Sequence, residues 1–442
     1  MGNNRFLQNT SWLMLGQVLR LILSFFVGII TARFLGTTNL GTIDYVASYI
    51  AFFTALIGFG LNGIVVHEFV NHSDSEGKIL GTAIFMRFIV GLISVPAFLV
   101  IVFAVDGYDK TIMTVALMQS LQLPFLCFDT INYWYQYKSK SKYVVVIQTI
   151  AYVASALYKI VLLIMEKSVV WFALAVSIDY IMLGLLYMFI YNRHKEQKLG
   201  FSFEIAKRII KNCIPFIFSE LMVVISSQSD RILIKHLLDN TTDNVGLYYS
   251  AMTICTMVSF IPLAILDSAR PFIARAKAES EQLYQARFSQ LLCALIWILL
   301  LYSAVVSIFA ELIIYIMYGT AFMGAVNCLR IAVWYSAFSY LGGALSFWFV
   351  CEKQKRYVFL FAFLGAVFSI ALNFIFIPLW GINGAAFTMV MTQIFKNVIL
   401  PLLFKETRGF TKFTINGILF KHVTFKDILS LLPSKNKLHI KK

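Results

Sequence analysis

The residues best suited to chemistry lie in one apolar stretch, residues 212–238, which reads NCIPFIFSELMVVISSQSDRILIKHLL. The stretch is long enough to cross a bilayer, which requires ~20 residues. Successive residues turn ~100° around a helix, so one face carries Glu220, Ser227, Arg231 and Lys235. A charge at the bilayer centre costs ~3 kcal/mol, and we therefore expect this face to contact protein or water.

Two interpretations of this polar stripe remain open. In the first, the whole face contacts protein or water. In the second, Arg231 and Lys235, which lie in the last turns of the helix, extend their long side chains to the membrane surface. Glu220 lies ~12 Å from the start of the helix and cannot escape in this way. Asp230 is off the centre of the stripe, where it can hold the stripe in place or pair with another helix.

A second polar stripe is predicted in the first apolar stretch, residues 9–34. Its polar face consists of Asn9, Gly16, Gln17, Arg20, Ser24 and Thr31. Aligning Arg33 with Lys235 places Arg20 within about half a turn of the depth of Glu220. If the two helices line one cavity, Arg20 and Glu220 can pair across it.

The composition requires a membrane protein around these stripes. The chain has 442 residues, of which 60% are hydrophobic and 13% are charged, about half the charged fraction of a soluble domain. Its net charge of +15 comes from short basic runs between apolar stretches. This distribution is the positive-inside pattern of membrane proteins, so no nucleic-acid partner is expected.

Twelve apolar stretches predict an all-α integral membrane protein with twelve transmembrane helices. An even number places both termini on one side of the membrane. The basic residues gather in the loops of that side, whereas the opposite loops contain only Lys110 and Lys167. Both termini are therefore predicted to be cytoplasmic.

A weak internal repeat predicts two halves. The first span ends ITARFLGTTNLGTIDYVAS and the seventh ends LIKHLLDNTTDNVGLYYSA, which aligns Gly41 with Gly246. We predict two six-helix bundles around a central cavity, residues 1–191 and 212–404, with a cytoplasmic linker at 192–211. The alternative is that all such outer turns look alike. The basic tail, 405–442, is predicted to be cytoplasmic, as an amphipathic surface helix or a solvated end.

Several classes of protein are disfavoured by the motifs. The six cysteines are dispersed, with no CxxC pair, and the six histidines lack ligand spacing. The sequence contains no phosphate loop, catalytic serine motif or zinc motif. We therefore expect neither an enzyme nor a bound metal or cofactor.

Three stretches resemble a known family. They are TARFLGTTNLGTIDYVASYIAFFTALIGFGL, SQSDRILIKHLL followed by GLYYSA, and IPLWGINGAAFTMV. In this order they resemble the O-antigen and capsule flippases, the polysaccharide-type members of the multidrug/oligosaccharidyl-lipid/polysaccharide exporter superfamily. The resemblance extends from residue 1 to about residue 405.

The resemblance implies a V-shaped pair of bundles in the bacterial cytoplasmic (inner) membrane. The implied substrate is an undecaprenyl-pyrophosphate-linked oligosaccharide of lipopolysaccharide or capsule, moved from the cytoplasmic to the outer leaflet by alternating access. Other polysaccharide assembly proteins are possible partners. The implied substrate-binding residues are Arg20, Arg231 and Lys235, supported by Gln17, Ser227 and the weaker candidate Arg33. Glu220 and Asp230 are implied candidates for gating or ion coupling.

Two other functions remain as alternatives. A drug or cation antiporter of the same superfamily should favour uncompensated acidic residues in its cavity, whereas these stripes carry at least as many cations. A membrane polysaccharide polymerase or ligase usually has a large outer loop, and the outer loops here are short.

Overall fold

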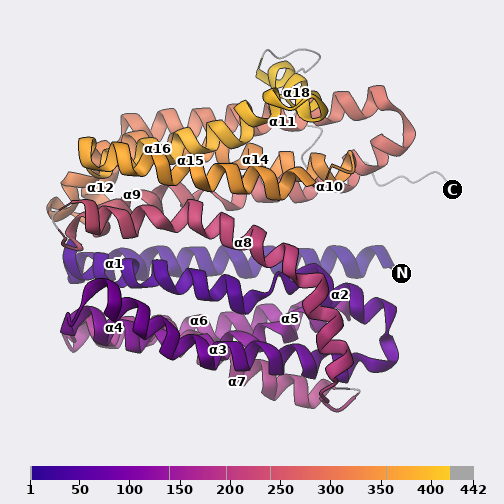
Figure 1. Cartoon of the computed structure of the whole chain (residues 1–442), viewed down its shortest axis with the longest axis horizontal. Helices are drawn as coiled ribbons and strands as arrows, with labels where there is room; N and C mark the ends of the chain where they lie inside the picture. The colour runs from indigo at the N-terminus through magenta and orange to yellow at the C-terminus, as the bar shows by residue number, and fades with distance from the viewer. Residues whose placement is uncertain (1, 139, 196, 239, 355, 419–442) are drawn as a thin grey trace. The chain divides into compact units, whose positions relative to one another are not determined.

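The computed structural model describes residues 2–138, 140–195, 197–238, 240–354 and 356–418, with side chains from residue 23 onward except at 62, 63, 141, 215 and 271. These residues form helices and short connections (Figure 1). They pack into two compact units, Met1–Gly246 and Leu247–Lys442. Residues 212–246 thus pack in unit 1. The predicted division into bundles 1–191 and 212–404 rests on the internal repeat and stays a prediction.

Unit 1 contains the helices that carry the polar stripe and its neighbours. Its elements are α1 (Gly2–Gly58), α2 (Leu61–Asn71), α3 (Glu76–Asp106), α4 (Lys110–Ser120), the 3-10 helix η2 (Leu123–Asp129), α5 (Thr130–Tyr137), α6 (Ser141–Ile164), α7 (Val169–His194) and α8 (Phe203–Leu237). The helix α8 packs along α1 and also contacts α2 and α3.

Unit 2 begins inside α9 (Asp243–Met257) and packs mainly around α11 and α14. Its further elements are α10 (Phe260–Glu279), α11 (Glu281–Ile308), α12 (Ala310–Tyr318), α13 (Val326–Ala332), α14 (Trp334–Cys351), α15 (Arg356–Trp380), α16 (Ile382–Ile394), a π-helical segment (Phe395–Ile399), α17 (Leu400–Leu403) and α18 (Arg408–Ile418). Phe410 and Phe413 of α18 pack into the apolar core of this unit. The rest of the predicted amphipathic tail lies outside the described residues.

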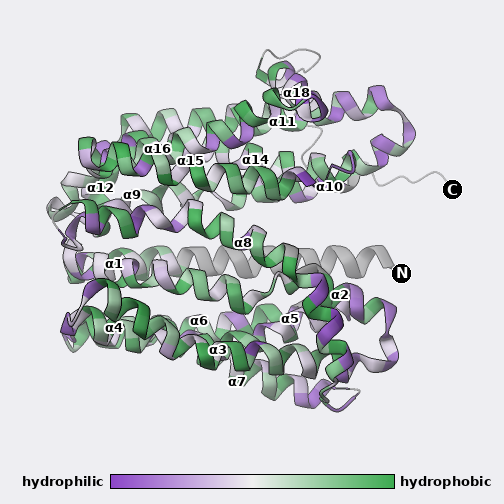
Figure 2. Ribbon diagram, in the orientation of Figure 1, coloured by the Kyte–Doolittle hydropathy of each residue, from purple (hydrophilic) through white to green (hydrophobic). Residues whose placement is uncertain are grey.

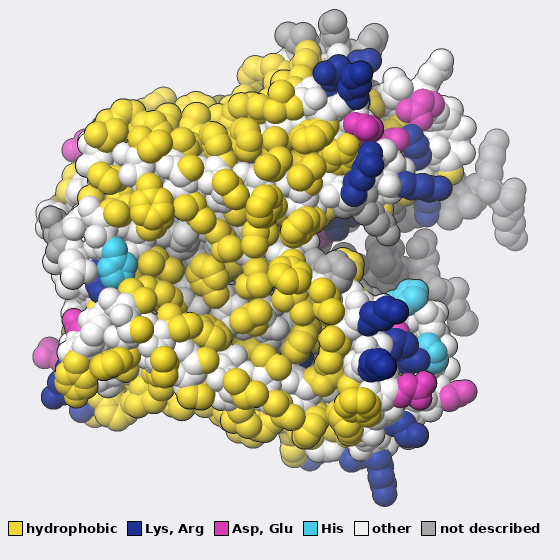
Figure 3. All heavy atoms as spheres, viewed as in Figure 1, with side chains coloured by type: hydrophobic (Ala, Val, Ile, Leu, Met, Phe, Trp, Pro, Cys, Tyr) yellow, Lys and Arg dark blue, Asp and Glu magenta, His cyan; other side chains and the backbone are white. Residues whose placement is uncertain are grey.

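The chain is a multi-pass membrane protein. Nine helices in the described part are long and apolar enough to cross a membrane, or up to eleven if each of two bent pairs forms one span. Hydrophobic residues cover the middle of the helices, and hydrophilic residues gather toward their ends (Figures 2 and 3). The sequence predicts twelve spans. The count in the described residues is lower, because the first two predicted spans lie in one helix, α1. Twelve spans therefore stay a prediction.

Three breaks interrupt the helices of unit 1. Gly36, with φ 70° and ψ 179°, divides α1 into two helical pieces. Phe59 and Gly60 both have positive φ, at 52° and 61°, and separate α1 from α2. The third break bends α8 by 46° between Phe203–Ile214 and Phe216–Leu237; the intervening Pro215 cannot donate the helical backbone hydrogen bond.

The end of the predicted linker 192–211 contains Phe203, Ile205, Ile209 and Ile210, which predict a surface helix that lies against the membrane. The helix forms, and Phe203 and Ile210 are exposed. Ile205 and Ile209, however, are buried in the core of unit 1. Only one side of this segment is therefore free to face lipid, because the other side packs on α2 and α3.

The two glycines aligned by the internal repeat meet in unit 1. A Cβ added at Gly41 would lie 1.8 Å from the carbonyl oxygen of Thr242 and 2.7 Å from the nitrogen of Gly246. A Cβ added at Gly246 would lie 2.0 Å from the carbonyl oxygen of Thr37. Glycine at both positions lets the turn after α8 pack directly on the backbone of α1.

We predict that Gly41→Ala lowers the free energy of unfolding by ~1–3 kcal/mol, the usual cost of overpacking. The measurement is the thermal unfolding midpoint of purified protein in detergent. The matched control is Gly28→Ala in the same helix, where a Cβ meets nothing within 4 Å. Equal midpoints for the two variants would contradict the close contact.

Candidate functional site

A buried ion pair joins the polar stripe of α8 to α1. The Nε of Arg231 donates to Oδ2 of Asp44 at 2.6 Å. The Nη1 of the same guanidinium donates to the backbone oxygen of Ser227 at 2.9 Å and to Oε1 of Gln228 at 3.0 Å. The Arg231 and Asp44 side chains are only 13% and 11% exposed. The guanidinium is therefore held in one orientation by both helices.

A second ion pair joins α8 to the end of α3. Lys235 donates to Asp106, and their side chains are 5% and 1% exposed. The Tyr45 hydroxyl donates to the same carboxylate at 2.9 Å, and the Lys235 ammonium lies 4.6 Å from the centre of the Tyr45 ring. His236 Nε2 lies 2.9 Å from that hydroxyl. The Asp106 carboxylate thus connects α8, α1 and α3.

Hydrogen bonds between the two turns of the repeat extend this contact. The hydroxyls of Thr37 and Thr38 donate to the Asp243 carboxylate. The hydroxyl of Thr242 donates to the backbone oxygen of Thr38 at 2.9 Å and lies 2.9 Å from the hydroxyl of Thr42. We call the set of residues 37–45, 106, 231–236 and 242–246 the charged cluster.

The energetics of the charged cluster follow from its burial. Removing both charges from water is costly, and their attraction in a low-dielectric site offsets that cost only while both partners are present. Loss of one partner leaves an uncompensated buried charge, which typically costs ~3–5 kcal/mol. The pairs therefore determine where the far end of α8 lies within unit 1.

Glu220 occupies a different environment, at the break between α1 and α2. A Cβ added at Gly58 would lie 3.5 Å from Oε2 of the Glu220 carboxylate. The Arg87 guanidinium lies on the other side of the break and donates to the backbone oxygen of Ile57 at 2.9 Å and to the Thr130 hydroxyl at 2.8 Å. The carbonyl end of this part of α1 therefore meets a cation, which matches the helix dipole and satisfies a backbone oxygen near the break. The Glu220 carboxylate lies beside the same break.

The structure brings together only part of the predicted set of site residues. Ser227, Arg231 and Lys235 lie in successive turns of α8, as the helical face predicts. Asp230 is buried, at 2% exposure, whereas Arg33 is exposed. The side chains of Gln17 and Arg20 lie outside the described residues, and the pairing of Arg20 with Glu220 stays a prediction.

Sequence reasoning missed the partners of the α8 cations. Asp44 lies near the end of a predicted span, which favours hydration, but it is 9% exposed and paired. Asp106 was not among the residues singled out from the sequence. Arg87 and Asp129 lie at comparable depths in neighbouring predicted spans, which favours a pair, but the Arg87 guanidinium binds Ile57 and Thr130 instead. The available signal was that Lys235 and Arg231 each need a buried anion, but sequence spacing does not reveal which one.

Among the residues that the structure describes, no group of three or more His, Cys, Asp and Glu side chains is arranged to hold a metal ion. The arrangement contains ion pairs, tyrosine hydroxyls and exposed helix ends.

Residues 6–277 match a protein family that is described as "Polysaccharide biosynthesis protein". The chain belongs to this family. The match includes the parts of α1 to α8 that form the charged cluster and the Phe59–Gly60 break. A search of curated proteins finds no significant match.

Solved structures show the fold of this family member. The chain resembles "Lipid II flippase MurJ, inward closed conformation" at 13% identity, with a TM-score of 0.71 over 92% of this chain and 90% of that chain. It also resembles an inward-facing multidrug resistance MATE family transporter of the MOP superfamily at 14% identity, with a TM-score of 0.68 over 90% and 95%. At these identities the similarity shows the fold alone, which is a MOP-type transporter fold.

We predict that Asp106→Asn lowers the free energy of unfolding by ~3–5 kcal/mol, because it leaves the Lys235 charge buried against a neutral amide. Adding Lys235→Met should recover most of this loss. The measurement is the unfolding midpoint in detergent. The control is Asp267→Asn, which removes an exposed pair with Arg270 and should change stability by less than ~0.5 kcal/mol. Equal effects of the two Asp→Asn changes would show that the Lys235 pair does not stabilise the fold.

Proposed function

We propose that this protein is a flippase for undecaprenyl-pyrophosphate-linked oligosaccharide, the repeat unit of O-antigen or capsule. It moves the lipid from the cytoplasmic to the outer leaflet of the bacterial inner membrane, with twelve spans and both termini in the cytoplasm. The observation that carries this proposal is membership of the polysaccharide biosynthesis family across residues 6–277. A fold shared with a lipid II flippase supports a lipid-linked substrate.

The α8 cations suit the charged part of such a substrate. A pyrophosphate cannot enter a low-dielectric membrane without counter-charge, and guanidinium groups bind phosphate oxygens through charge-assisted bonds. In the structure Asp44 and Ser227 already orient Arg231. When the substrate binds, its pyrophosphate replaces Asp44 as the partner of Arg231. Without substrate, the Asp44 carboxylate occupies the position of the phosphate. Lys235, Arg20 and Arg33 supply further positive charge, and Gln17 and Ser227 bind sugar hydroxyls.

The acidic residues of α8 serve the conformational step. Alternating access requires elements with two discrete arrangements. We assign this part to the Phe59–Gly60 break, because the Glu220 carboxylate lies beside it and Arg87 binds the carbonyl oxygen of Ile57. Neutralising Glu220 removes the negative charge from this break. Glu220 is therefore the candidate for gating or ion coupling, and Asp230 is a second candidate next to the Arg231 pair.

The alternative function is drug or cation antiport, since multidrug resistance MATE transporters share the fold. The family match favours a polysaccharide precursor instead.

We predict that purified protein in liposomes moves an undecaprenyl-pyrophosphate-linked oligosaccharide across the bilayer, measured by accessibility of the sugar to an external glycosidase. Arg231→Ala and Arg20→Ala should each lower the initial rate at least tenfold, because they remove phosphate contacts. Arg270→Ala, which removes an exposed cation in unit 2, should leave the rate unchanged.

Normal transport by both Arg231→Ala and Arg20→Ala would contradict the pyrophosphate-binding role of these residues. Transport of a cationic dye with no movement of the lipid-linked sugar by the wild-type protein would favour the antiporter. Gel filtration of each variant before reconstitution controls for loss of folding.

A further inference from the structure

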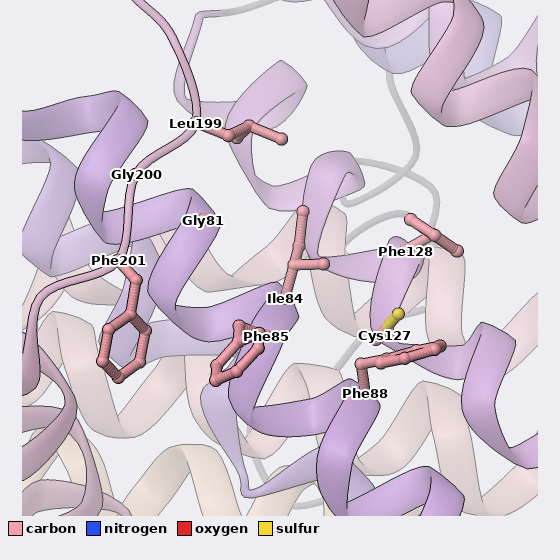
Figure 4. A pocket seen from close by; sticks show the side chains of 9 residues that line it. All are labelled: Gly81, Ile84, Phe85, Phe88, Cys127, Phe128, Leu199, Gly200 and Phe201. Atoms are coloured by element: carbon pink, nitrogen blue, oxygen red, sulfur yellow. The ribbon is translucent and has the colours of Figure 1, made fainter.

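An apolar groove of about 350 Å³ lies on unit 1, away from the charged cluster (Figure 4). Its wall is formed by α3, by η2 and by the segment that leads into α8. The side chains that line it include Ile84, Phe85, Phe88, Cys127, Phe128 and Phe201. Phe85 and Phe201 are 48% and 52% exposed, so the groove opens at the surface of the unit. Its volume falls at the lower end of the ~300–1,000 Å³ typical of small-molecule sites.

The groove is built from fixed backbone. Residues 197–202, which we call the strap, run along the first turns of α3. The Gly200 N–H donates to the backbone oxygen of Gly77 at 3.1 Å, and the Ser202 N–H donates to the Thr82 hydroxyl at 3.0 Å. The Phe85 and Phe201 rings meet edge to face, with their centroids 5.0 Å apart. A ligand would therefore enter a preformed site.

Two exposed cations, Lys78 and Lys198, belong to the segments that form one end of the groove. The Lys78 side chain lies 3.3 Å from the position of a Cβ on the lining residue Gly200, and Lys198 directly precedes the lining residue Leu199 in the strap. The neighbouring acid Glu76 does not neutralise them, because it is buried and bonded to Lys138 and Trp134. This end of unit 1 is the one predicted to face the cytoplasm.

The chemistry of the groove selects among membrane lipids. Apolar burial alone gives no preference, because lipid tails are as apolar as the groove. Selection must come from shape and from charge. The small volume suits one chain better than the paired chains of a phospholipid. The lysines favour an anionic phosphate over a neutral or zwitterionic headgroup.

We propose that the groove binds the chain of a polyprenyl phosphate, with the phosphate at Lys78 and Lys198. This assignment rests on the proposed function, since a lipid-linked sugar carries such a chain. The strap leads directly into α8, so a chain bound here brings the substrate to the start of the helix that carries Arg231. The groove is thus a loading site for the lipid part of the substrate before its head enters the path.

The test is photolabelling of the full-length protein in phosphatidylcholine nanodiscs with a polyprenyl phosphate that carries a diazirine in its chain. Label should appear within residues 84–88 and 199–201. Excess unlabelled polyprenyl phosphate should remove at least 80% of it, and the same concentration of phosphatidylglycerol should remove little. Equal competition by phosphatidylglycerol would overturn the assignment, because the groove would then be a general contact for anionic lipids.

Two variants separate the groove from other lipid-facing surface. Ile84→Trp fills the groove and should lower groove labelling at least fivefold, whereas Ile93→Trp, at a residue 63% exposed on the same helix, should not. Lys78→Gln combined with Lys198→Gln should weaken labelling without filling the groove, and Lys110→Gln is its control. Unchanged labelling in both test variants would overturn the assignment.

The outcome is distinguishable from failure of the proposed function. Transport of lipid-linked sugar by a wild-type protein whose groove is not labelled would refute the groove and leave the flippase intact. Specific labelling of the groove in a protein that moves no lipid-linked sugar would support chain binding and refute the flippase.

Discussion

Buried charge on α8 is the constraint on which the rest of unit 1 depends. Arg231 and Lys235 lie in a bent helix whose two parts together are long and apolar enough to cross a membrane, where an unpaired cation is strongly unfavourable. Asp44 from α1 and Asp106 from α3 provide the counter-charges at almost complete burial. The far end of α8 therefore has one favourable position in this unit. The packing of Gly41 on Gly246 follows, because α8 must approach α1 closely for both pairs to form.

A further charge, Glu220, lies in the middle of the same helix, beside the Phe59–Gly60 break. A Cβ added at Gly58 would lie 3.5 Å from its carboxylate oxygen. Arg87 donates to the carbonyl oxygen of Ile57, just before the break. A broken helix inside a membrane is tolerated only where such groups satisfy its backbone. Hence α8 is joined to α1 and α3 by ion pairs near its far end, and its middle lies against the break between α1 and α2.

Much of this arrangement could be predicted from the sequence, but not the partners. Helical periodicity placed Ser227, Arg231 and Lys235 on one face, and Arg231 and Lys235 of that face each pair with an acid of unit 1. Periodicity says nothing about which neighbouring helix lies opposite, so Asp44 and Asp106 were missed. The repeat aligned Gly41 with Gly246, yet only the fold reveals that they touch. The apolar groove has no local signal, because its walls come from α3, η2 and the strap, which are distant in sequence.

The central claim is that the Arg231–Asp44 pair orients a phosphate-binding group and is not only a structural bond. Transport and stability of the neutral double variant Asp44→Asn/Arg231→Gln test it most directly, in liposomes and in detergent respectively. Both charges are removed together, so the stability should return close to that of the wild type. The account predicts that this stable variant transports at least tenfold more slowly. A double variant with wild-type stability and wild-type transport of lipid-linked oligosaccharide would contradict it.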